Sequence, residues 1–177
     1  FGRLSKPFAL QHFGLDEVVD VVTIGKMSHV CATLFTDAYR ARPGLLSQTF
    51  TASTSAIAAS QVILDALADG DFYGDDGRIA RCHKRMTGKF AEFAERYPGK
   101  ITGPFGIGAM IACTIGDGSF ELSKHFTDTL FEKGLIGFIA GHHPVRVRFL
   151  PPIGCLTDTH IDSACAIIEE TLKEVVT

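Results

Sequence analysis

No stretch of the sequence approaches the roughly 18 to 20 consecutive apolar residues of a transmembrane helix, so no membrane span is expected. The start of the sequence also lacks a basic segment followed by an apolar one, and we expect a cytoplasmic protein. Positive charge is not in excess, because 17 Lys and Arg face 20 Asp and Glu, for a formal net charge of −3. Such a balance does not attract phosphate backbones, so nucleic-acid binding is not expected.

Cysteine patterns that would indicate a disulfide framework or a metal site are missing. The five cysteines, an odd number, include no C-x-x-C pair and no spacing typical of metal ligands. We therefore expect reduced, mostly buried thiols and no metal. A chain of 177 residues buries roughly 70% of the surface that its unfolded form exposes, so its core needs no covalent support. With 46% hydrophobic and 21% charged residues, the composition is typical of a folded soluble domain.

The first part of the sequence predicts two strands and a helix. Residues 18–25 are nearly all apolar and rich in valine, which is typical of a strand buried on both faces of a parallel sheet. A second short strand is predicted at 30–35. Apolar residues share one helical face from 53 to 68, and Gly70 follows as a plausible end of that helix.

The second part predicts further helices and strands in alternation. From 76 to 97, apolar residues recur at steps of three and four, which makes this the clearest helix of the sequence. The elements predicted after it are a strand at 106–114, a helix at 119–133, strands at 135–140 and 145–149, and a helix that begins near Thr157 or Asp158. In the strand at 145–149, Arg146 and Arg148 alternate with apolar residues, so both should leave the same face of a sheet.

Strands that alternate with helices predict the α/β class. A break at 72–76 separates two pieces, and the first piece has too few strands to close a core of its own. We therefore expect an exposed apolar patch around residues 15–35 in this chain. The sequence opens on Phe1 rather than on methionine, and we expect it to be a piece of a longer protein.

Lys26 is the first candidate for chemistry. It follows the valine-rich strand and Gly25 directly, and open α/β sheets bind ligands at the carboxyl ends of their strands. A lysine amine that is partly desolvated and lies near other cations can attack an aldehyde. On position alone, a solvated charge at the end of a strand is the alternative interpretation.

Six segments occur in an order that resembles one enzyme family. They are FGRLSKPFALQHFG, VDVVTIGK, SQTF, GIGAMIACTIG, EKGLIGFIAG and VRFLPPI. In order and spacing, the chain resembles the C-terminal portion of the class III aminotransferases of the ornithine, acetylornithine, 4-aminobutyrate and lysine ε type. Their cofactor is pyridoxal 5'-phosphate (PLP). The resemblance implies PLP fold type I, with residues 1–72 as the end of a large domain with a mostly parallel sheet and 73–177 as a small α/β domain.

The resemblance also implies roles for particular residues. Lys26 stands at the position of the lysine that forms a Schiff base with PLP and moves the substrate proton. Gln48 and Thr49, before the aromatic Phe50, stand where relatives bind the cofactor phosphate of the neighbouring subunit. This implies a homodimer with its site at the subunit interface. Arg148 stands where relatives bind a substrate carboxylate, for which a planar bidentate donor is suited.

Without the resemblance, the same residues have plainer interpretations. Thr49 would be a capping residue in a polar loop, and Arg146 would be structural. Arg148 would be equally an ion-pair partner or an anion site.

The activity that the resemblance implies is transfer of an amino group from an amino acid or ω-amino donor to a 2-oxo acid, 2-oxoglutarate in most relatives. Gln48 and the residues after Lys26 depart from the family pattern, which favours as an alternative a non-catalytic interaction or regulatory module. Fold type I also hosts racemases, aminomutases and decarboxylases. The acidic partner of the cofactor ring lies upstream of Phe1 in relatives, so we expect the 177 residues alone not to catalyse the reaction.

Overall fold

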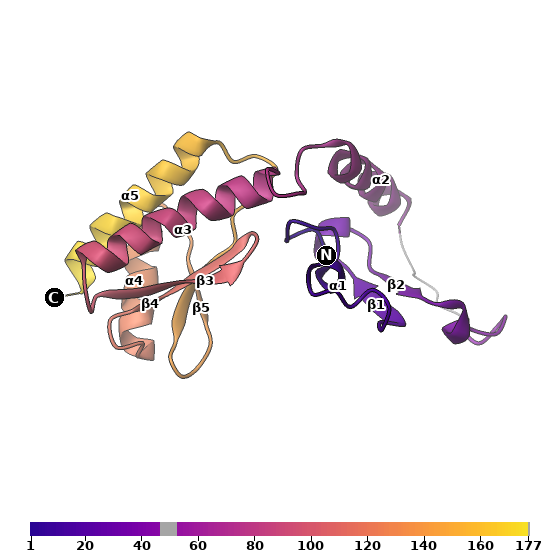
Figure 1. Cartoon of the computed structure of the whole chain (residues 1–177), viewed down its shortest axis with the longest axis horizontal. Helices are drawn as coiled ribbons and strands as arrows, with labels where there is room; N and C mark the ends of the chain where they lie inside the picture. The colour runs from indigo at the N-terminus through magenta and orange to yellow at the C-terminus, as the bar shows by residue number, and fades with distance from the viewer. Residues whose placement is uncertain (47–52, 177) are drawn as a thin grey trace. The chain divides into compact units, whose positions relative to one another are not determined.

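Residues 1–46 and 53–176 are described by the computed structural model of the chain. They form two units, Phe1–Gly74 and Asp75–Thr177 (Figure 1). The assignment of these parts to the large and small domains of a PLP enzyme stays a prediction.

The first unit consists of several short elements and one longer helix. They are α1 (Ala9–His12), β1 (Val21–Ile24), the 3₁₀ turn η1 (Lys26–Ser28), β2 (Ala32–Phe35), the 3₁₀ turn η2 (Asp37–Tyr39) and α2 (Thr54–Asp69). The two strands pair as an antiparallel hairpin, in register from Val21 opposite Phe35 to Ile24 opposite Ala32. Both predicted strands are therefore present, and the turn between them contains Lys26.

The predicted burial and direction of the first strand are wrong for this chain. β1 pairs with its neighbour antiparallel rather than parallel, and its side chains are half-buried or exposed. In the described residues no third strand joins this sheet, and a two-stranded ribbon cannot bury both of its faces. As predicted, apolar side chains of this region are exposed; they are Leu15, Val18, Val21, Met27, Leu34 and Phe35.

The helix predicted at 53–68 is confirmed as α2. Ser53 caps its start, because its hydroxyl accepts a hydrogen bond from the backbone N–H of Ala56. At the other end, the N–H of Gly70 donates to the carbonyl of Ala66. Both ends therefore lie within one residue of the predicted ones.

The second unit is an antiparallel sheet with helices packed on one face. Its elements are α3 (Arg78–Arg96), β3 (Ile101–Ile107), β4 (Met110–Ile115), α4 (Phe120–Glu132), β5 (Phe138–Ala140), β6 (Arg146–Phe149) and α5 (Asp158–Val175). The strands lie in the order β3-β4-β6-β5, and α3 and α5 run side by side (Figure 1). The α/β class is confirmed, as are the three predicted helices. The strands predicted at 135–140 and 145–149 are also confirmed, as β5 and β6.

The single strand predicted at 106–114 is wrong, because the structure has a hairpin of β3 and β4 there. The glycines and the proline before residue 106 resemble a loop in the sequence. β3 is an edge strand, and the pairing shifts by a bulge between Thr102 and Phe105, which accommodates Gly103 and Pro104. Edges and bulges are the places where a strand tolerates proline.

The core lies between the helices and one face of this sheet. Phe90 of α3 is fully buried and packs edge-on against Phe149 of β6, with ring centroids 5.7 Å apart. Phe126 of α4 and Ile168 of α5 are also fully buried in this cluster. Because side chains alternate along a strand, the neighbours of the buried Val147 and Phe149 leave the opposite face. Those neighbours are Arg146 and Arg148, as predicted.

Candidate active site

Lys26 lies at the end of β1 in a strained turn. Its φ is 59° and that of His29 is 61°, in the left-handed region that L-residues other than glycine rarely adopt. The N–H of His29 donates to the carbonyl of Lys26 at 3.0 Å, which closes the turn. The side chain of Lys26 is exposed, and among the described residues its amine has no hydrogen bond or ion pair. Such strain costs on the order of 1–3 kcal/mol, and strained residues cluster at active sites, ligand clamps and switch regions.

The surroundings of Lys26 hold this turn in place. Ser28 is buried, and its hydroxyl donates to the carbonyl of Val30 at 2.6 Å. Gly2 packs so closely that an added Cβ would lie 2.7 Å from the sulfur of Met27. Helix α2 also contacts η1. The contacts of Gly2 and α2 with this turn were not predicted, because they join segments far apart in the sequence.

Arg148 lies on the helix-free face of the sheet in the second unit. In the pairing of the strands, it stands between Ala112 of β4 and Phe138 of β5. Its guanidinium carbon lies 5.9 Å from the centroid of the Phe138 ring. Its Nε atom is buried and has no hydrogen-bond partner. A planar cation with a free donor is suited to a carboxylate.

Arg146 lies beside Arg148 on the same face. Its guanidinium carbon is 4.0 Å from the centroid of the Phe105 ring, and its Nε atom is also buried without a partner. No carboxylate lies within ion-pair distance of either arginine in the part of the chain that the structure describes. The sequence indicated the shared face of the arginines but not their contacts with Phe105 and Phe138.

The predicted site residues are not all placed by the structure. Gln48 and Thr49 lie outside the described residues. Lys26 belongs to the first unit and Arg148 to the second. The residues that the structure brings together are the two arginines and the two aromatic rings against which they lie.

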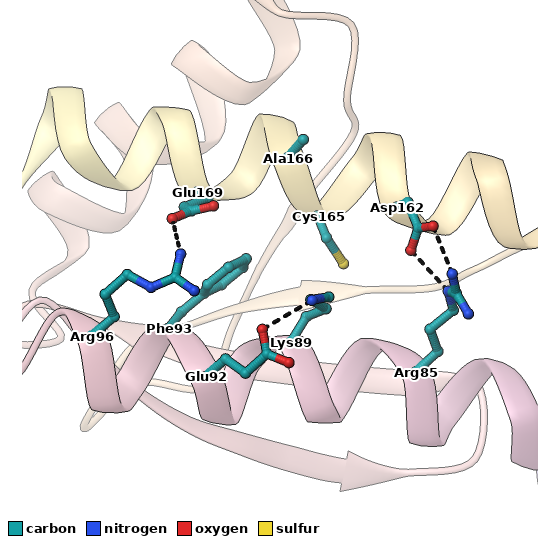
Figure 2. A pocket seen from close by; sticks show the side chains of 9 residues that line it. All are labelled: Arg85, Lys89, Glu92, Phe93, Arg96, Asp162, Cys165, Ala166 and Glu169. Atoms are coloured by element: carbon teal, nitrogen blue, oxygen red, sulfur yellow. Dashed lines mark hydrogen bonds and ion pairs between the residues drawn. The ribbon is translucent and has the colours of Figure 1, made fainter.

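A groove of about 390 Å³ between α3 and α5 is a weaker candidate (Figure 2). Charged side chains line it, and they pair with one another. Arg85 is paired with Asp162 at 2.6 Å, Lys89 with Glu92 at 2.9 Å, and Arg96 with Glu169 at 2.6 Å. A charged ligand would have to displace these partners, so we assign the groove to helix packing.

Residues 1–46 and 53–176 contain no group of three His, Cys, Asp or Glu side chains arranged to hold a metal ion. No helix within them is both long and apolar enough to cross a bilayer.

Comparison with known proteins identifies the family of the chain. The sequence model of the class III aminotransferase family matches residues 1–172, nearly the whole sequence. The chain belongs to this family, as the resemblance of its segments predicted.

Individual relatives are distant but cover almost all of the chain. It is 26% identical to an acetylornithine aminotransferase of Streptococcus mutans over 181 residues, which are 98% of this chain and 44% of that protein. The structure of a lysine aminotransferase from M. tuberculosis matches with a TM-score of 0.82 at 24% identity, over 99% of this chain and 40% of that one. An acetylornithine aminotransferase from Elizabethkingia anophelis matches with a TM-score of 0.81 at 24% identity, over 98% and 45%. The chain therefore spans less than half the length of these relatives.

Class III aminotransferases are PLP enzymes, and the residues of this chain fit such a cofactor. PLP reacts through an aldehyde, for which the protein must supply a primary amine. Lys26 supplies one without a competing partner in the described residues, at a strained backbone position. Arg148 supplies an unsatisfied donor of the kind that a substrate carboxylate needs.

Proposed function

We propose that this chain takes part in the PLP-dependent transfer of an amino group from an amino acid or ω-amino donor to a 2-oxo acid, with 2-oxoglutarate as the acceptor. The observation that carries the proposal is the strained turn at Lys26, whose amine has no partner among the described residues. Membership of the class III family supports it.

Two tasks fall to the amine of Lys26 in this proposal. This amine would hold the cofactor by condensing with its aldehyde, with loss of water, and, once free again, it would accept the proton from the substrate Cα. Bound PLP supplies the electron sink that makes this Cα proton acidic. The turn that fixes Lys26 serves both tasks, because a base must lie within hydrogen-bond reach of the proton that it moves.

Arg148 binds the substrate carboxylate in this proposal. Contact with the Phe138 ring restricts the guanidinium, and the buried Nε is left with a hydrogen bond to make. A carboxylate satisfies two N–H groups of an arginine at once, which fixes the direction of the substrate. Orienting the substrate in this way lowers the entropy cost of the reaction.

Gln48 and Thr49 complete the proposal as contacts to the cofactor phosphate of a neighbouring subunit. This role requires a homodimer, with each active site at the interface. The order of the SQTF segment after Lys26 supports it, since the same order occurs in the family resemblance.

The test is chemical labelling of the full-length gene product. The purified protein is incubated with PLP, reduced with borohydride and analysed by peptide mass spectrometry, which locates each lysine that carries a pyridoxyl group. We expect the label on Lys26 at near stoichiometric yield. The visible absorbance band of PLP joined to a lysine should be absent in Lys26→Ala.

Lys6 is the matched control, because it is an exposed lysine of the same unit. Lys6→Ala should keep both the band and the label on Lys26. Label spread evenly over exposed lysines, or absent from Lys26, would contradict the proposal and favour a non-catalytic module.

A further inference from the structure

We propose that Arg146 is a second anion-binding residue beside Arg148, and that the two arginines together select a substrate with two carboxylates. The inference rests on the proposed function, in which Arg148 binds one substrate carboxylate. It adds a specificity-determining role for a residue that the sequence indicated only as structural.

The first support is the spacing of the two arginines. Both lie on β6, two residues apart, and both leave the face opposite the core. Two residue rises along a strand are about 6.6 Å. A dicarboxylate with a spacer of two or three carbons can place one acid group at each guanidinium, whereas a monocarboxylate can satisfy only one of them.

The second support is that aromatic rings restrict both side chains. Arg146 lies over Phe105 at 4.0 Å, and Arg148 lies near Phe138 at 5.9 Å. A guanidinium stacked on a ring keeps the N–H groups in its plane available to a carboxylate. Because the arginines are already held, less side-chain entropy is lost when a ligand binds.

The third support is that, among the described residues, neither arginine has a counter-charge. Arg85 and Arg96, on the helices of the same unit, each have a carboxylate oxygen at 2.6 Å. For Arg146 and Arg148 no such partner lies within the described ranges, and each Nε is buried without a hydrogen bond. Two neighbouring cations in this state repel each other, and a dianion would relieve both the repulsion and the missing hydrogen bonds.

The test is isothermal titration calorimetry of the full-length protein with glutarate and with pentanoate, a pair that differs by one carboxylate at equal chain length. Glutarate should bind at least about tenfold more tightly than pentanoate, because it satisfies a second charged hydrogen-bonding group. Arg146→Gln should remove this advantage by weakening glutarate while leaving pentanoate unchanged. Arg148→Gln should weaken both ligands.

Arg40→Gln is the matched control, because it removes the same charge from an exposed ion pair with Asp37. It should leave both affinities unchanged. Equal weakening of both ligands by Arg146→Gln would assign Arg146 to structure alone and overturn the inference. The comparison of glutarate with pentanoate on the unsubstituted protein requires no variant to fold, and equal affinities there would also overturn it.

Failure of this inference is distinguishable from failure of the proposed function. Label on Lys26 with no effect of Arg146→Gln would leave the aminotransferase proposal standing and reject the role of Arg146. Selective binding of glutarate through Arg146 without label on Lys26 would reject PLP chemistry and retain the dicarboxylate site.

Discussion

Tyr97 at the end of α3 donates a hydrogen bond from its hydroxyl to Oε1 of Glu169 in α5, at 2.6 Å. Arg96 reaches the same oxygen at 2.6 Å and Lys173 at 3.4 Å (Figure 2 shows the contact with Arg96). The hydrogen bond from Tyr97, followed by the interactions with Arg96 and Lys173, lowers the pKa of Glu169 from its ordinary value of 4.5. One carboxylate thus joins the two helices.

This arrangement predicts a loss of stability in acid. The folded-state pKa of Glu169 lies below the unfolded one, so the unfolded state binds more protons as the pH falls. The contribution of Glu169 is therefore complete above about pH 4.5 and is lost as the pH falls through the lowered folded pKa. In urea unfolding at about pH 7 and about pH 3, Glu169→Gln should show a smaller difference in unfolding free energy than the unsubstituted protein.

Glu95→Gln is the control for this experiment, since Glu95 is an exposed carboxylate of α3 for which the described chain contains no ion pair. Glu95→Gln should retain the full difference in unfolding free energy between the two pH values. If Glu169→Gln also retained it, the contact with Tyr97 would not be formed in solution.

Phe90→Ala should strongly destabilise the second unit. Phe90 is fully buried against Phe93 and Phe149, and truncation leaves a cavity that close-packed neighbours fill only in part. The expected loss is about 3–5 kcal/mol of unfolding free energy, measured by urea denaturation. Phe131→Ala in α4 is the control, because Phe131 is 69% exposed, and it should change stability by less than about 1 kcal/mol.

The five thiols should separate into two groups by reactivity. Cys31 and Cys155 are exposed, whereas Cys82, Cys113 and Cys165 are buried. Burial raises the pKa of Cys82 to about 11 and the pKa values of Cys113 and Cys165 to about 12, which suppresses the reactive thiolate. With a thiol reagent at about pH 8, two thiols should react rapidly and the other three only on unfolding.

The double variant Cys31→Ser, Cys155→Ser should lose the rapid phase completely. A rapid reaction of more than two thiols in the unsubstituted protein would show that the core of the second unit opens readily.

The helices were predictable because their signal is local. The apolar spacing of α3 lies within one segment, and Thr157 and Gly70 mark helix ends beside the helices themselves. Strand pairing is not local. Residues such as Val21 indicate a strand without indicating how many partners it has, so the hairpin of β1 and β2 was mistaken for part of a buried parallel sheet.

In the candidate site, too, the local features were predictable from the sequence and the non-local ones were not. Lys26 and Arg148 were identified by short motifs, and the shared face of the two arginines followed from the period of a strand. The left-handed backbone of Lys26 follows no rule of sequence, because lysine does not favour it. The contact between Arg146 and Phe105 joins positions 41 residues apart (146 − 105) and depends on the order of the strands in the sheet.

The strain at Lys26 can be measured by comparing two substitutions that both remove the amine. Ala keeps the penalty of a side chain at φ 59°, whereas Gly adopts this conformation freely. Lys26→Gly should therefore be more stable than Lys26→Ala by about 1 kcal/mol in urea unfolding, although neither can bind PLP covalently. Val62, an exposed position within α2, is the control, since there Gly should be less stable than Ala by a similar amount. If the Gly variant were less stable than the Ala variant at both positions, the turn would be relaxed in solution. Lys26 would then not be held under strain for its chemistry.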